Sequence, residues 1–160
     1  GNYVYNNGDA GMALLESFNN DVSNNIFENN KYGVRFCVGC AGNVFEHNVI
    51  SGSTEINTFS YLGSDEPEVG ESGRCQNNTF RENTIVGGGL ESLKIKEADG
   101  TQFIDNTFED AAKIRFDDAT GTIMLGNVGL NESELEVDND ACFDELSLES
   151  YEDIDYEPLC

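Results

Sequence analysis

The feature that most constrains the fold is a repeat of 23 residues. Asparagine recurs at a set of spaced positions, namely Asn2, Asn25, Asn48, Asn83, Asn106 and Asn127. Successive positions are 23 residues apart, except for a step of 35 after Asn48 and a step of 21 before Asn127. A fixed period of this length is typical of solenoids and related repeat architectures.

Apolar residues follow the same period. One series is Val4, Phe27, Ile50, Ile85 and Phe108; another is Val22, Phe45, Phe80, Phe103 and Met124; a third pairs Met12 with Leu14, Val34 with Phe36, Leu93 with Ile95, and Ile114 with Phe116. Each period therefore holds three short alternating segments separated by turn residues, which is a strand pattern. The sequence predicts an all-β right-handed parallel β-helix with three strands per 23-residue coil and about five to six coils, stacked about 4.8 Å apart.

The repeated asparagine has a structural explanation. Its short amide tolerates the left-handed backbone conformation at a corner, and it can hydrogen-bond to the equivalent asparagine one coil away. We therefore expect a ladder of asparagines along one corner of the β-helix.

The domain organisation follows from where the repeat holds. Residues 1–127 are predicted to form the coils, with a loop insertion near 51–77 that accounts for the long step. Residues 128–160 are acidic and are predicted to form a C-terminal cap or tail rather than another coil. Because the chain starts within a coil, and open β-helix ends are normally covered, further coils are expected on the N-terminal side.

Charge and cysteine content limit the partners and the compartment. The net charge of −23 argues against nucleic acid and anionic membranes as partners, and we expect a monomer. Five cysteines, with glycosylation sequons at Asn77 and Asn131, favour a secreted protein in an oxidising compartment.

Cysteine positions also suggest pairings. Cys40 and Cys75 each precede a corner asparagine by three residues, so they are expected to stack in adjacent coils and form a disulfide. A second disulfide, between Cys142 and Cys160, is expected to close the acidic tail, with Cys37 left as a thiol.

Basic residues are scarce, and the repeat collects most of them. In the segment Gly33–Cys37, Val34 and Phe36 are predicted to point inward, so Arg35 points outward. The same alternation places five of the eight cations on or beside one face of one sheet: Arg35, Lys94, Lys96, Lys113 and Arg115. We call these five residues the cationic strip.

The cationic strip supports two interpretations. It predicts binding of an elongated anionic ligand such as a polymer of sugar acids, to whose carboxylates Arg and Lys are suited. The alternative is that these cations form surface ion pairs with Glu16, Glu97, Asp117 and Asp118. In the segment 56–63 the outward pair is either Thr58 and Ser60 or, after a slip of one residue, Phe59 and Tyr61.

Two stretches carry a resemblance to a known family. The runs "GDAGMALLES" and "NNKYGVRF", within residues 1–36, resemble the later coils of brown-algal mannuronan C-5 epimerases and, more distantly, bacterial alginate epimerases. The resemblance covers about residues 1–127. It implies a β-helix that acts on alginate and converts polymeric β-D-mannuronate to α-L-guluronate.

The chain departs from that family at the catalytic motif. The epimerases use an Asp-Pro-His motif, which this sequence lacks, and its one histidine, His47, falls at a predicted corner. The resemblance therefore implies coils that bind alginate and contribute no catalytic residue. No cofactor is expected, although calcium is left open. Alternatives are a non-catalytic carbohydrate-binding β-helix, such as an adhesin or cell-wall protein, and a polyuronate lyase.

Overall fold

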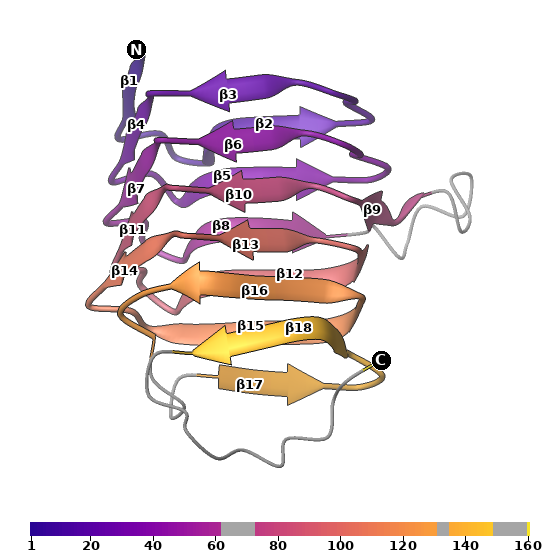
Figure 1. The fold of residues 1–160 in the computed structure, drawn as a ribbon. Coiled ribbons are helices and arrows are strands. Elements are labelled where there is room, and N and C mark those ends of the chain that lie inside the picture. Colours follow the sequence, from indigo (N-terminus) through magenta and orange to yellow (C-terminus); the bar gives the residue numbers. More distant parts are fainter. Residues whose placement is uncertain (62–72, 131–134, 149–159) are drawn as a thin grey trace.

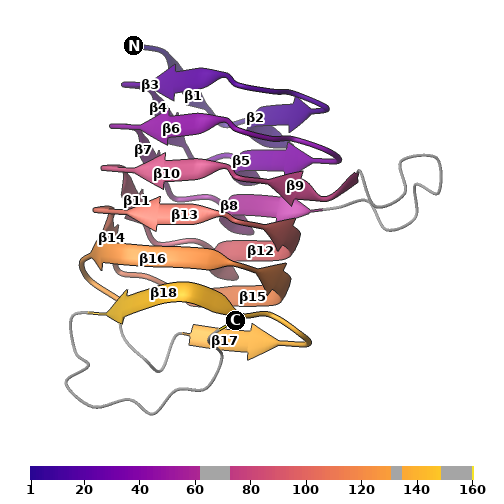
Figure 2. The ribbon, with the colours of Figure 1, turned by 45° about the vertical axis from the view of Figure 1, so that its right-hand side comes forward.

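The computed structural model describes residues 1–61, 73–130, 135–148 and 160 as a parallel β-helix built from three sheets (Figures 1 and 2). Sheet 1 contains β1 (Tyr3–Tyr5), β4 (Ile26–Glu28), β7 (Val49–Ser51), β11 (Thr84–Val86) and β14 (Thr107–Glu109). Sheet 2 contains β2 (Ala10–Leu15), β5 (Tyr32–Cys37), β8 (Ile56–Tyr61), β12 (Glu91–Asp99), β15 (Lys113–Thr120) and β17 (Leu135–Asp138), and β9 (Cys75–Gln76) pairs with β12. Sheet 3 contains β3 (Asp21–Ser23), β6 (Val44–Glu46), β10 (Thr79–Arg81), β13 (Gln102–Ile104), β16 (Thr122–Asn127) and β18 (Phe143–Leu148).

This architecture confirms the predicted fold class. All pairings between these strands are parallel, and each coil of about 23 residues contributes one strand to each sheet. Five coils are followed by a partial sixth, and the described residues contain no α-helix. No helix in the described ranges is long and apolar enough to cross a membrane.

The core runs along the axis of the β-helix, where the predicted apolar series stack in register. Val4, Phe27, Ile50, Ile85 and Phe108 align across sheet 1. Val22, Phe45, Phe80, Phe103 and Met124 align across sheet 3. Phe80 is fully buried and packs its ring 5.0 Å, between centroids, from the stacked ring of Phe103. The periodicity of the sequence therefore predicted the core correctly.

The asparagine ladder is confirmed in its hydrogen bonds. Asn83 donates from its backbone N and its Nδ2 to Oδ1 of Asn106, both at 3.0 Å, and the same pattern joins Asn2 to Asn25 and Asn25 to Asn48. A second ladder links Asn20 to Asn43 and Asn43 to Asn78, the two corner asparagines that follow Cys40 and Cys75 in the sequence.

The predicted backbone conformation of the ladder was wrong by one residue. The ladder asparagines do not have a positive φ; from Asn25 onward, the residue before each of them does. These preceding residues include Asn24, His47, Glu82 and Asp105, with φ of 58°, 54°, 52° and 51°. The left-handed residue turns the chain, which leaves the next side chain free to point inward and bond along the axis.

Strands extend into both segments that were expected to depart from the regular coils. Residues 51–61 contain regular strand positions of β7 and β8, so the extra length of the long step falls between Tyr61 and Gly73, mostly outside the described residues. At the other end, β17 and β18 pair in parallel with β15 and β16. Part of 128–160, where a C-terminal cap or tail was expected, therefore adds a rung to sheets 2 and 3. Alternation explains this rung, because Leu135 and Val137 continue the inward columns while the acidic residues alternate outward.

Candidate functional site

The cationic strip lies on the outer face of sheet 2. Strand register places Ala13, Arg35, Phe59, Lys94, Arg115 and Glu136 in one column, one residue from each of β2, β5, β8, β12, β15 and β17. The flanking columns are buried, with Val34, Phe36, Leu93 and Ile95 inaccessible to solvent. The column of Arg35, Lys94 and Arg115 thus faces outward, as predicted.

Strand register also decides between the two alternatives for the segment 56–63. Thr58 aligns with the inward residues Val34 and Leu93 and is fully buried. In strand register Phe59 therefore stands at the position of Arg35 and Lys94, as in the slipped alternative. Consecutive rungs along this column are about 4.8 Å apart.

Arg35 sits in a small polar cluster at the N-terminal part of the strip. Its Nη1 lies 3.2 Å from Oδ1 of Asp9, and its guanidinium carbon lies 5.7 Å from the ring centroid of Tyr32. The Tyr32 hydroxyl donates a 2.8 Å hydrogen bond to Glu55, and this bond raises the pKa of Tyr32. Tyr32 therefore stays protonated near neutral pH and is a poor general base.

Acidic side chains surround the C-terminal part of the strip. Arg115 lies 2.7 Å from Asp138, 3.6 Å from Glu136 and 4.0 Å from Glu91. Lys113 also contacts Glu136. These partners come mainly from β17, so the strip is completed by the rung that the sequence analysis had assigned to the tail.

Lys96 and Lys94 occupy neighbouring outward positions of β12. The Lys96 Nζ lies 3.7 Å from Glu97 and 3.9 Å from Asp117. The predicted ion-pair partners Glu97 and Asp117 are therefore present, whereas Asp118 pairs with Arg74 instead. Four side chains of the strip keep about a third of their surface open: 29% for Arg35 and Lys96, 30% for Arg115 and 38% for Lys113. Cations and acidic side chains are thus mixed on this face, whereas the protein as a whole is strongly acidic.

Away from the strip, the corner between sheets 2 and 3 carries Cys37, Cys40 and Cys75. Cys142 and Cys160 form a disulfide, as predicted, but Cys40 and Cys75 are separate thiols and the expected bond between them is absent. Their predicted stacking is correct, because Ala41 pairs with Gln76 in the next residue positions. Parallel neighbours hold their Cβ atoms near the strand spacing of about 4.8 Å, wider than the roughly 3.8 Å of a disulfide.

His47 lies apart from both features. It occupies a left-handed corner between β6 and β7, is about half exposed, and its Nδ1 is 3.4 Å from Glu82. This position agrees with the predicted corner location and gives His47 no access to the strip.

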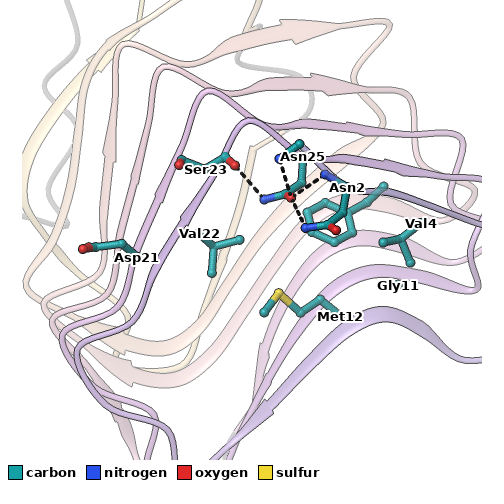
Figure 3. A pocket seen from close by; sticks show the side chains of 10 residues that line it. Asn2, Val4, Gly11, Met12, Asp21, Val22, Ser23 and Asn25 are labelled. Atoms are coloured by element: carbon teal, nitrogen blue, oxygen red, sulfur yellow. Dashed lines mark hydrogen bonds between the residues drawn. The ribbon is translucent and has the colours of Figure 1, made fainter.

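A cavity of about 420 Å³ opens at the N-terminal end of the β-helix (Figure 3). Val4, Met12 and Val22 line it, and they are the first members of the three core series (Figure 3). Asn2 and Asn25 border it through the first ladder hydrogen bond, at 2.9 Å. The cavity is therefore the open end of the core, and its lining offers no charged cluster beyond Asp21 and the terminal amine.

Among the residues that the structure describes, no group of three or more His, Cys, Asp or Glu side chains is placed to hold a metal ion.

Comparison with known proteins gives one match. No curated protein and no solved structure matches the chain. The family described as "Periplasmic copper-binding protein (NosD)" matches residues 1–131, which include all five complete coils. This match does not support the mannuronan epimerases in particular, although it agrees with the right-handed β-helix and with a location outside the cytoplasm. By this match over most of its length, the chain belongs to the NosD family of β-helix proteins.

Proposed function

We propose that the chain is an extracytoplasmic β-helix protein whose sheet 2 face binds an anionic polysaccharide of the polyuronate class. The observation that carries this proposal is the outward column in which Arg35, Lys94 and Arg115 stand in register on separate coils. A polyuronate repeats one carboxylate on every sugar, so a row of cations along the axis matches it in charge and direction.

The ion pairs of the strip are compatible with this role. Exposed pairs contribute only about 0–1 kcal/mol each. A bound carboxylate can therefore take the place of Asp9 on Arg35 at small cost, because Asp9 is itself 64% exposed. Tyr32, whose ring lies beneath the guanidinium, holds Arg35 in position.

Epimerisation and lyase chemistry both begin with abstraction of a proton next to a neutralised carboxylate. The strip offers neutralising groups, but the described residues bring no histidine to this face, and Tyr32 is held protonated by Glu55. The proposal is accordingly binding without turnover, in which this chain supplies binding coils of the epimerase type.

Calorimetry with mannuronate oligomers tests the proposal. We expect weak binding that declines as added salt screens the contacts, and no binding of neutral glucan oligomers of equal length. Affinity that rises with salt would show that the net charge of −23 governs the interaction and would refute a role for the strip. Guluronate signals in the proton NMR spectrum of the incubated polymer would refute the absence of turnover.

Copper binding is a second candidate, favoured by the thiols of Cys40 and Cys75. The family to which the chain belongs is described as copper-binding. Thiolates are the donors that Cu(I) prefers, and these two thiols stack in adjacent coils. Titration of the reduced chain with Cu(I) tests this candidate independently of polysaccharide binding.

A further inference from the structure

The corner that carries Cys37, Cys40 and Cys75 is built by a tight turn. Cys37 ends β5, Val38 and Gly39 make the turn, and Cys40 follows it. The carbonyl of Cys40 accepts a 2.9 Å hydrogen bond from the backbone N of Gln76, which fixes Cys40 against Cys75 of the next coil. Both of these cysteines are completely buried, whereas Cys37 is partly exposed.

The turn carries backbone strain. Val38 has a φ of 23° and is the one β-branched residue with a positive φ in the described ranges. Such a conformation is unfavourable for a branched side chain and persists only where the surroundings enforce it, often at functional sites. Here Gly39 donates a 2.7 Å hydrogen bond to the carbonyl of Gly73, which ties the turn to the residues just before Cys75.

The two buried thiols interact with each other. A hydrogen bond from Cys75 lowers the pKa of Cys40 to about 7, and backbone hydrogen bonds around Ser17 and Cys37 act in the same direction against the effect of burial. When protonated, the Cys40 thiol can instead donate to the carbonyl of Cys37, 2.9 Å away. Burial raises the pKa of Cys37, so Cys40 is the more readily ionised of the two thiols in this turn.

We propose that Cys40 and Cys75 bind one Cu(I) ion as a two-coordinate dithiolate site. The proposal deepens the copper candidate and does not depend on polysaccharide binding. Two ligands suffice, so the absence of a three-ligand cluster among the described residues is no obstacle. Binding forms two S–Cu bonds, and the proton of Cys75, together with any proton still on Cys40, leaves to solvent. No oxidation state changes, because the metal enters as Cu(I).

Several features of the corner suit this metal. Soft thiolates select Cu(I) over the harder divalent cations, and the apolar coil interior excludes water that would compete as a ligand. The two thiols are fully buried and stack in adjacent coils, where one ion can contact both. Cys37, pointing outward beside Arg35, lies outside the pair and serves as the matched control.

The test is an anaerobic titration of the reduced chain with Cu(I) in competition with bicinchoninate. We expect one Cu(I) per chain, and loss of more than about 100-fold in affinity for Cys40→Ser and for Cys75→Ser, since even outer-shell changes cost 10–100-fold. Cys37→Ser should retain the affinity of the unmodified chain.

The outcomes separate the site from the wider copper candidate. Copper binding that persists in Cys75→Ser would overturn the site but leave copper binding by the chain intact. No binding by the unmodified chain would overturn both. X-ray absorption of the unmodified copper-loaded chain needs no variant: two sulfur ligands are expected, and nitrogen ligands would overturn the site. A Cys40–Cys75 disulfide in chain isolated without reductant would overturn it as well.

Discussion

Oδ1 of Asn106 accepts two hydrogen bonds from Asn83, one from the backbone N and one from Nδ2, each 3.0 Å long. Asn106 is fully buried, and its own Nδ2 donates to the carbonyl of Phe80 and to Asn127. One side chain therefore satisfies two backbone groups of the preceding coil, the N–H of Asn83 and the carbonyl of Phe80. Such buried amides stabilise a β-helix through polar groups that would otherwise lack partners.

Asn106→Ala is expected to destabilise the chain by about 3 kcal/mol. Each buried group left without a partner costs about 1–3 kcal/mol, and this change affects the N–H of Asn83 and the carbonyl of Phe80. Urea unfolding followed by circular dichroism measures the difference. Gln102→Ala, on the partly exposed side of β13, is the control and should change stability by less than about 0.5 kcal/mol.

Phe80→Ala is expected to lower the free energy of unfolding by about 3–5 kcal/mol through lost apolar transfer and a cavity. Phe80 is fully buried and contacts the rings of Phe36, Phe45 and Phe103. The exposed Phe18 provides the comparison, since Phe18→Ala removes a ring that is 59% accessible. Equal melting midpoints for the two variants would contradict the assigned core.

The register of the core was predictable because burial leaves a periodic signal in the chain. The register of β8 was not, since Phe59 and Tyr61 look like inward residues, whereas Thr58 aligns with Val34 and is buried. Strand pairing decided that choice, and pairing depends on neighbours in other coils. The same reason explains why the partners of Arg115 were missed: Glu136 and Asp138 reach it only through the added rung β17.

Loss of the Cys142–Cys160 disulfide is expected to destabilise the C-terminal rung. The bond closes a loop with a sequence separation of 18, for which the chain-entropy estimate is about 3 kcal/mol. The Cys142→Ser/Cys160→Ser double variant should therefore unfold at lower urea concentration, whereas Cys37→Ser should not. A midpoint equal to that of the unmodified chain would mean that the bond leaves stability unaffected.

Asp99 is expected to make stability depend on pH. Although burial opposes the shift, hydrogen bonds from Arg74 and Thr120 hold the pKa of Asp99 below its ordinary value of 3.8. Because the pKa of Asp99 is lower in the folded state than in the unfolded state, ionised Asp99 stabilises the fold. This stabilisation is present above pH 3.8 and is lost as the pH falls through the lower pKa of the folded state.

Comparing Asp99→Asn with the unmodified chain by thermal melting at several pH values checks this dependence. The variant should melt at a lower temperature than the unmodified chain at pH 7, and this difference in melting temperature should narrow below pH 3.8. Asp110→Asn, at an exposed position, should show a small gap at every pH. A constant Asp99→Asn gap across this range would contradict the assigned ion pair with Arg74.

The central claim is that sheet 2 binds a polyuronate through the cationic strip, and calorimetry of matched variants tests it most directly. Arg35→Ala and Lys94→Ala change outward residues of the strip, whereas Arg81→Ala changes an arginine on sheet 3 that pairs with Glu46 at 2.6 Å. Each substitution removes one positive charge, so the three variants are equal in net charge. We expect at least about a tenfold loss of mannuronate-oligomer affinity for the two strip variants, or roughly 1.4 kcal/mol, and unchanged affinity for Arg81→Ala. Equal affinities for all three variants would contradict the claim.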